Sequence, residues 1–94
     1  MSQPNDFTNK TFTPSITRCF ELLEVIKSKH DLNAPIRILD LGCGTGSLIF
    51  LLAKHMPNSS FVGLDISTPN IKIALDQLSN DDNQSRIQYV DGDY

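Results

Sequence analysis

An acid stands just ahead of three closely spaced glycines in the stretch ILDLGCGTGSL, residues 38–48. The acid is Asp40, and the glycines are Gly42, Gly44 and Gly46. A glycine-rich turn between a strand and a helix presents backbone N–H groups and commonly holds an anion. Because like charges repel each other, Asp40 would disfavour a pyrophosphate and favour a ligand with a cationic end. The stretch therefore predicts a site for a ligand that carries positive charge.

The spacing of the glycines also departs from the dinucleotide-binding pattern. That pattern is G-x-G-x-x-G, and Ser47 stands where its third glycine would fall. A second acid, Asp65, ends the next apolar run, SSFVGLD. An acid at this place can accept hydrogen bonds from both hydroxyls of a ribose, as it also does in NAD-binding folds. S-adenosylmethionine, which carries an ammonium, a sulfonium and a ribose, suits both acids.

The elements that must position these residues alternate between strands and helices. Apolar patterns predict strands at residues 36–41, 59–65 and 86–90, separated by helices at about 47–55 and 68–78. The near-continuous apolar pattern of the first strand is typical of a strand covered on both faces. Thr68 and Pro69 are expected to cap the second helix. The β-α-β-α-β order predicts a parallel α/β sheet with right-handed crossovers.

One more helix is predicted ahead of the first strand. Thr13 and Pro14 suit a helix start, and apolar residues then recur at intervals of three and four. The cations of Lys29 and His30 suit the carbonyl end of that helix. We therefore expect a single domain with a loose arm at 1–12, a helix at 13–30 and a βαβαβ core at 36–94.

Composition limits the classes of function. The chain has 94 residues and a formal net charge of −3 without a cluster of basic residues, which gives no clear signal for nucleic acid. The longest apolar run, residues 48–53, is too short to span a membrane. Cys19 and Cys43 are too few for a disulfide scaffold, and the N-terminus lacks the features of a secretory signal, so we expect a cytoplasmic protein. The histidines and the pair Asp81 and Asp82 lack metal-ligand spacing, so we expect no metal.

Three segments together resemble the motifs of class I, Rossmann-like S-adenosylmethionine-dependent methyltransferases. ILDLGCGTGSL resembles the first motif, FVGLDIS the second and IQYVDGDY the third, in the expected order over residues 36–94. The resemblance implies the N-terminal, cofactor-binding half of a three-layer Rossmann-like fold. It also implies S-adenosyl-L-methionine as cofactor and transfer of its methyl group to an acceptor.

The first motif of that family implies roles for the glycine loop. Asp40 would help to hold the methionine ammonium, and the alternative is an acid that caps the amides of the loop. Gly42, Gly44 and Gly46 would form a backbone floor beneath the methionine and ribose, and their alternative is a plain strand-to-helix turn. Cys43 belongs to the same cofactor-binding loop, where we expect a small filler rather than a nucleophile because no partner base is evident.

The second and third motifs imply the residues that hold the nucleoside. Asp65 would accept hydrogen bonds from the ribose hydroxyls, with a cap for the following turn as the alternative. Ile66 would form an apolar wall for the adenine. Asp93 would accept a hydrogen bond from the adenine amino group, with Tyr94 beside the base. Asp91 competes with Asp93 for that role, and an acidic surface turn is the alternative to both.

The resemblance leaves the acceptor and the catalytic residues unknown. In that family a fourth strand lies beside the first, so three strands alone leave an open edge, and we expect either a truncated chain or a homo-oligomer through that edge. A small molecule is favoured as the methyl acceptor over a lipid, a protein or RNA. Two other functions stay open: an NAD-binding oxidoreductase, which Asp40 and Ser47 disfavour, and a non-catalytic cofactor-binding or assembly module.

Overall fold

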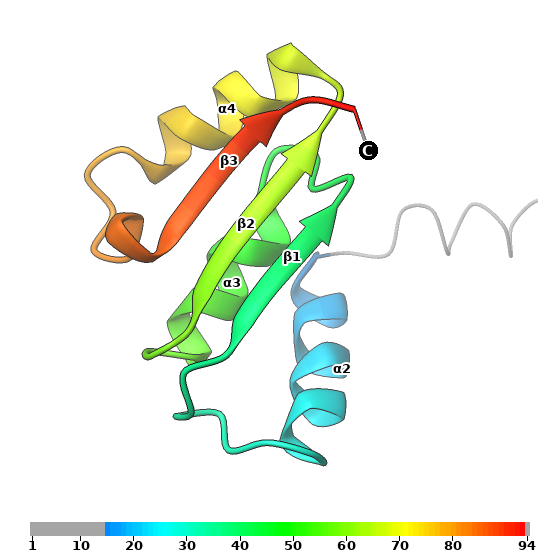
Figure 1. Cartoon of the computed structure of the whole chain (residues 1–94), viewed down its shortest axis with the longest axis vertical. Helices are drawn as coiled ribbons and strands as arrows, with labels where there is room; N and C mark the ends of the chain where they lie inside the picture. Colours follow the sequence, from blue (N-terminus) through cyan, green and yellow to red (C-terminus); the bar gives the residue numbers. More distant parts are fainter. Residues whose placement is uncertain (1–14, 94) are drawn as a thin grey trace, which may run out of the picture.

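The computed structural model describes residues 15–93, and they contain a three-stranded parallel sheet (Figure 1). The strands lie in the order β1-β2-β3, with Asp40 opposite Gly63 and Asp65 opposite Asp91. Their bounds are β1 (Arg37–Leu41), β2 (Ser60–Asp65) and β3 (Ile87–Asp91). The predicted alternation of strands and helices and the parallel sheet are confirmed.

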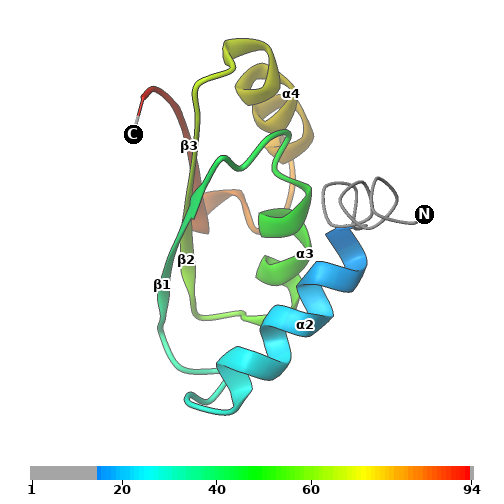
Figure 2. The same cartoon turned by 90° about the vertical axis from the view of Figure 1, so that its right-hand side faces the viewer.

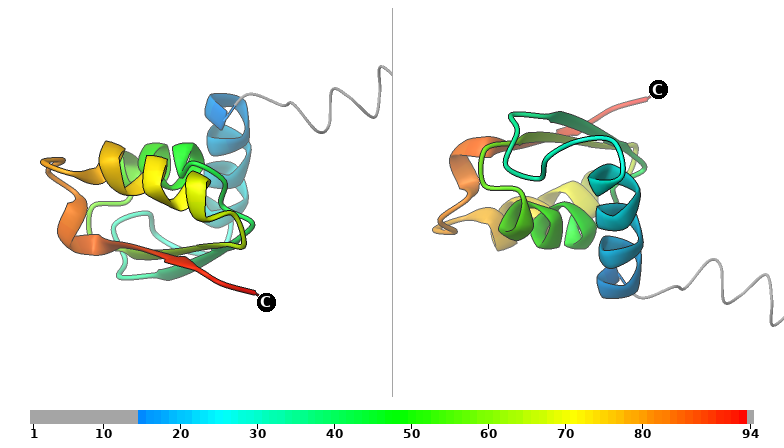
Figure 3. Two further views of the ribbon diagram at one scale, coloured as in Figure 1. Left: turned by 90° about the horizontal axis from the view of Figure 1, so that it is seen from above. Right: turned by 90° about the horizontal axis from the view of Figure 1, so that it is seen from below.

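The helices cover one face of this sheet. They are α2 (Ser15–Lys27), α3 (Ser47–His55) and α4 (Thr68–Leu78). Figure 2 shows the sheet from its edge with the three helices on the same side, and both views of Figure 3 agree. On the opposite face Leu39 and Leu41 are 60% and 53% exposed. The expectation of a strand covered on both faces is therefore wrong for residues 15–93, which form two layers.

The core lies between the helices and the sheet. Alternate residues of each strand point into it, so Phe61 of β2 and Ile87 and Tyr89 of β3 are buried while Gln88 is exposed. The buried apolar residues form one cluster: Cys19, Leu23, Cys43, Ile49, Leu52, Ala53, Met56, Phe61, Ile71, Ala74, Leu78, Ile87 and Tyr89. This cluster contains both cysteines, and no disulfide joins them.

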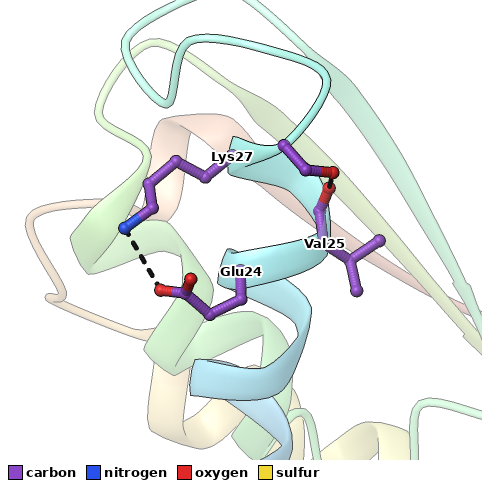
Figure 4. Close-up of polar contacts among 4 residues, drawn as sticks. Glu24, Val25 and Lys27 are labelled. Atoms are coloured by element: carbon purple, nitrogen blue, oxygen red, sulfur yellow. Dashed lines mark hydrogen bonds and ion pairs between the residues drawn. The ribbon is translucent and has the colours of Figure 1, made fainter.

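Helix α2 ends earlier than predicted, at Lys27 rather than at His30. The chain continues as a tighter turn, in which the Ser28 hydroxyl donates a hydrogen bond to the carbonyl of Val25 at 2.6 Å. Figure 4 shows this contact beside the exposed ion pair between Lys27 Nζ and Glu24 Oε2, which are 3.1 Å apart. The predicted arm at 1–12 and the predicted helix start at 13–14 lie outside the described residues.

Helix α4 is capped by Ser67 and not by Thr68. The Ser67 hydroxyl accepts a hydrogen bond from the amide of Asn70 at 3.3 Å, while Thr68 is already helical and Pro69 occupies the first turn. The expected cap is thus wrong by one residue. The polar stretch after α4 contains a short 3₁₀ helix, η1 (Gln84–Arg86), which leads into β3.

Arg86 closes the amino end of the sheet. Its guanidinium donates hydrogen bonds to the carbonyls of Ala53, Met56 and Ser59 at 2.9, 2.9 and 2.6 Å, and to Asn83 Oδ1 at 2.6 Å. The carbonyls of Ala53 and Met56 lie at the end of α3, where a helix leaves C=O groups without intrahelical partners. One side chain therefore satisfies the end of α3 and the start of β2.

The sheet has an open side at β1. In the described part of the chain, β1 pairs with β2 alone, as the sequence led us to expect. Within residues 15–93, no helix has the length and apolar composition needed to cross a membrane.

Candidate functional site

The carboxyl ends of the strands bring four acids to one edge of the sheet. Asp40 lies near the end of β1, Asp65 ends β2, Asp91 ends β3, and Asp93 follows it. Parallel strands place all of these ends at the same edge, where open α/β sheets bind their ligands. Among the described residues, no three His, Cys, Asp or Glu side chains form a group suited to a metal ion. The four acids together give this edge of the sheet a negative charge.

The loop between β1 and α3 needs all three of its glycines for its backbone alone. Gly42, Gly44 and Gly46 have φ angles of 75°, 60° and 84°, in the left-handed region that other residues rarely adopt. The amides of Gly42 and Cys43 both donate to the carbonyl of Leu64 at 2.7 and 3.1 Å, which ties the loop to the end of β2. The glycines thus have a structural cause that holds with or without a ligand.

The backbone donors of this loop are largely used within the protein. The Gly44 amide donates to Asp65 Oδ2 at 2.8 Å, and the Gly46 amide donates to the carbonyl of Cys43 at 3.1 Å. The expectation that the loop itself is a pocket of free amides therefore holds only for the first turn of α3, where a helix leaves its N–H groups unpaired. Around Gly44 there is open space, since a Cβ atom added there would meet no heavy atom within 4 Å.

Asp40 is half-buried and accepts no hydrogen bond from the described residues. Burial raises the pKa of Asp40, Arg18 of α2 opposes this rise, and the charge of Asp65 adds to it. The alternative role, a cap for the loop amides, is not what the structure shows, because those amides donate to Leu64, Asp65 and Cys43. A carboxylate in this setting is stabilised by any cationic group that reaches it.

Asp65 is held in place by two backbone amides. Ser67 N donates to Oδ1 and Gly44 N donates to Oδ2, each at 2.8 Å. These hydrogen bonds lower the pKa of Asp65, so the group is ionised at neutral pH. Asp65 therefore does cap the following turn, which was one alternative. A carboxylate has about four lone-pair positions, so it keeps acceptors for a ligand such as a ribose.

A cavity of about 400 Å³ opens beyond Asp65, and its lining includes Ile66, Thr68, Asp91, Gly92 and Asp93. The Ile66 side chain is 68% exposed there, so its apolar surface is accessible to a ligand. Asp91 Oδ2 accepts a hydrogen bond from the Thr68 hydroxyl at 3.0 Å, whereas Asp93 accepts none from the described residues. Tyr94 lies outside the described residues.

Cys43 is buried beneath the loop and does not face the edge. Its thiol lies close to Gly63 of β2, where an added Cβ atom would be 2.9 Å from the sulfur. Burial, with further contributions from Asp40 and Asp65, raises the pKa of Cys43 to about 11. The thiol is therefore protonated and unreactive at neutral pH, which supports the expected filler.

Tyr89, which was not among the residues predicted for the site, lies on β3 beneath the glycine loop. Its ring contacts the positions that Cβ atoms of Gly46 and Gly63 would occupy, and its hydroxyl donates to the carbonyl of Gly46 at 3.3 Å. The only sequence signal was the alternation of Ile87 and Tyr89 along β3, which places both on the covered face.

A second hollow, of about 390 Å³, follows the open side of β1. It is lined mainly by apolar residues of α2 and α3, such as Leu22, Ile26 and Leu48, and Asp40 reaches its wall. The predicted residues therefore do not share one cavity. Asp40 faces the hollow beside α2, Ile66 and Asp93 line the cavity beyond β2, and Asp65 with the loop lies between.

Comparison with known proteins identifies the family of this chain. A family model described as a methyltransferase domain matches residues 32–89. A malonyl-[acyl-carrier protein] O-methyltransferase from Bacillus cereus is 42% identical over 53 residues, which are 56% of this chain and 20% of that protein. The chain thus spans about a fifth of the length of this relative.

Solved structures agree with the family match. The structure described as StiE O-MT residues 942–1257 superposes with a TM-score of 0.65 at 27% identity, over 78% of this chain and 26% of that one. A putative sarcosine dimethylglycine methyltransferase from Galdieria sulphuraria superposes with a TM-score of 0.73 at 19% identity, over 83% and 28% of the two chains. The second likeness concerns the fold alone.

Proposed function

We propose that this chain, which belongs to the class I S-adenosylmethionine-dependent methyltransferases, binds that cofactor across the carboxyl edge of its sheet. The observation that carries the proposal is Asp40, a half-buried carboxylate without a hydrogen-bond partner among the described residues, beside a second ionised acid. Burial disfavours the charge of such a group, the charge of Arg18 offsets this in part, and a further cation that reaches the carboxylate would stabilise it. The methionine end of the cofactor carries an ammonium that would do so.

The other residues of the edge suit the remaining parts of the cofactor. Gly42, Gly44 and Gly46 would lie beneath the methionine and ribose, and the open space over Gly44 allows a close approach. The loop also contains Cys43, which would contribute through its backbone because its thiol is buried.

The nucleoside would lie between β2 and the end of β3. Asp65 would accept hydrogen bonds from the ribose hydroxyls with the lone pairs that Gly44 and Ser67 leave. The exposed side chain of Ile66 would support the adenine, and Asp93 would accept a hydrogen bond from its amino group, with Tyr94 beside the base.

The chemistry of transfer would need little from this part of the chain. When bound, S-adenosylmethionine supplies a methyl group already activated by the sulfonium, and S-adenosylhomocysteine is left once an acceptor lone pair has taken that methyl. The contribution of the described residues would be binding and alignment. We assign no catalytic residue to them.

The acceptor, the partners and the compartment are further proposals. We favour a small-molecule acceptor, since no basic cluster indicates nucleic acid. The open side of β1, with exposed Leu39 and Leu41, would be covered by further chain or by a second copy. The free thiols of Cys19 and Cys43 suit the cytoplasm. The domain boundaries at 1–12, 13–30 and 36–94 belong to the same proposal.

Calorimetric titration of the full chain with S-adenosylhomocysteine, and separately with NAD, tests the cofactor. We expect binding of S-adenosylhomocysteine alone, because it keeps the ammonium that Asp40 requires. Asp40→Asn should weaken that binding about tenfold or more, since hydrogen bonds to charged groups contribute roughly 1.5–3 kcal/mol.

Asp76→Asn provides the matched control. Asp76 is an exposed acid on α4, so this variant makes the same change in net charge away from the edge. Its affinity should equal that of the unmodified chain. Heat from NAD but not from S-adenosylhomocysteine, or equal affinities in the two variants, would refute the proposal.

A further inference from the structure

Tyr89 supports the glycine loop from below. It is 9% exposed, and its ring fills the space between Gly63 of β2 and Gly46 of the loop. A Cβ atom at Gly46 would lie 2.7 Å from Tyr89 Cζ, and one at Gly63 would lie 2.8 Å from Tyr89 Cδ1. Glycine at both positions therefore lets the ring lie directly against the backbone of two neighbouring segments.

The Tyr89 hydroxyl reaches the residue from which α3 starts. It donates to the carbonyl of Gly46 at 3.3 Å, and the same carbonyl accepts the amide of Phe50 at 2.9 Å, the first hydrogen bond of α3. Gly46 is the N-cap of α3 and has no side chain to cap it, with φ 84°. The orientation of its carbonyl is thus set by Phe50 from the helix and by Tyr89 from the sheet.

We infer that Tyr89 is a positioning residue for the cofactor: its hydroxyl holds the Gly46 peptide, and with it the loop and the first turn of α3, in the arrangement that receives the methionine end. This inference rests on the proposed function. Tyr89 is buried beneath the loop and would not touch the ligand, so its effect would pass through the backbone of residues 44–49. The adenine, at Ile66 and Asp93, would lie away from this contact.

The alternative is that Tyr89 only fills the core. Its ring would then matter and its hydroxyl would not. Tyr89→Phe separates the two, because it removes the hydroxyl and keeps the ring. The control is Ile71→Val, a buried residue of α4 whose trimming lowers stability and removes no hydrogen bond to the loop.

Two measurements on the full 94-residue chain test the inference. The first compares the affinities for S-adenosylhomocysteine and for 5′-methylthioadenosine, which lacks the amino-acid part. Because 3.3 Å is longer than a typical O–H···O bond, we expect Tyr89→Phe to weaken S-adenosylhomocysteine binding about three- to fivefold. Binding of 5′-methylthioadenosine, which keeps the ribose but lacks the methionine end, should weaken by a smaller factor, and Ile71→Val should leave the ratio of the two affinities unchanged.

The second measurement needs no ligand. Hydrogen exchange of the amides of Phe50 and Leu51 should be about three- to fivefold faster in Tyr89→Phe than in Ile71→Val, relative to the amides of β2. Unchanged exchange at Phe50, or faster exchange by the same factor throughout the chain, would overturn the inference. If the unmodified chain bound no S-adenosylhomocysteine, the proposed function would fail, and the exchange experiment would still decide the role of the hydroxyl.

Discussion

The two ends of the sheet treat their polar groups in opposite ways. At the amino end, Arg86 donates hydrogen bonds to three backbone carbonyls, and the Ser59 hydroxyl accepts from Ile36 N and donates to the carbonyl of Ala34. At the carboxyl end, Asp40 is half-buried and accepts no hydrogen bond from any residue in the range 15–93, and burial raises its pKa. Polar groups at the amino end are hydrogen-bonded within the protein, whereas at the carboxyl end the charge of Arg18 offsets the burial of Asp40 only in part.

This difference separates stability from function in the molecule. Groups at the amino end are expected to contribute to the free energy of unfolding, since removing Arg86 would strand buried acceptors. Groups at the carboxyl end divide further: Asp65 is held by two amides, and Asp40 is not. The comparison predicts that substitutions at the two ends have effects of different size, and at Asp40 of opposite sign.

Arg86→Ala should produce the largest loss of stability. It removes the donor for carbonyls of Ala53, Met56 and Ser59, and we expect a decrease of about 3–4 kcal/mol in the free energy of unfolding. Urea unfolding followed by far-UV circular dichroism measures it. The free energy of unfolding of Arg86→Lys should lie between those of the unmodified chain and Arg86→Ala, because lysine keeps the charge without the planar guanidinium.

The exposed pair of Glu24 and Lys27 is the comparison for Arg86. Lys27→Ala should cost less than about 0.5 kcal/mol, because solvent screens an exposed ion pair. Equal losses in Arg86→Ala and Lys27→Ala would mean that the amino end is not the more tightly bonded one.

Gly46→Ala should produce the second-largest loss of stability, and this loss should be larger than that of Gly44→Ala. Both positions have a left-handed backbone, which costs a residue with a Cβ atom about 1–2 kcal/mol. At Gly46 the new Cβ would also overlap the Tyr89 ring, while at Gly44 it would meet nothing within 4 Å. We expect a loss of about 2–4 kcal/mol for Gly46→Ala in the same unfolding experiment. A larger loss for Gly44→Ala would contradict the packing of Tyr89 beneath the loop.

Asp40→Asn should slightly raise the stability of the fold at neutral pH, although it weakens the binding of the cofactor. The ionised carboxylate is disfavoured by burial, so the neutral amide should gain less than about 1 kcal/mol, a figure reduced by solvent screening of a half-exposed group. The folded-state pKa is raised, so this gain should be present at pH 7 and disappear as the pH falls towards about 4. Thermal unfolding at several pH values measures it. A lower melting temperature for Asp40→Asn at pH 7 would show that Asp40 has a partner in the folded chain.

Asp65→Asn should change the stability at neutral pH with the opposite sign, as a decrease. The folded-state pKa of Asp65 is lowered, so its ionised form stabilises the fold above about pH 4, the ordinary carboxyl range. That stability is lost as the pH falls through the lowered pKa. The difference between the unmodified chain and Asp65→Asn should therefore shrink below about pH 4, as measured by the same thermal series. A difference that grows on acidification would mean that the amides of Gly44 and Ser67 do not favour the ionised form.

Much of the fold was predictable because it depends on local patterns. The apolar runs ending at Leu41 and Asp65 and the glycine loop between them predict a strand, a turn and a helix without any distant contact. The helix caps were less predictable, because Ser67 and Thr68 are both good cap residues. In the structure Ser67 is the cap of α4, and the Thr68 hydroxyl donates a hydrogen bond to Asp91 instead. The exposed face of β1 was mispredicted because an apolar pattern does not say which element covers each side.

The amino-acid sequence by itself determined the order of the elements, the left-handed glycines of the loop and the presence of acids at the strand ends. Only the tertiary structure decided that, within the described part of the chain, backbone amides hold Asp65 and not Asp40. It also decided that Tyr89 lies under Gly46 and that Arg86 reaches carbonyls 27 to 33 positions away. The physical reason is that a hydrogen-bond partner or a desolvated charge depends on what the fold brings near it. Residue type and spacing along one strand do not contain that information.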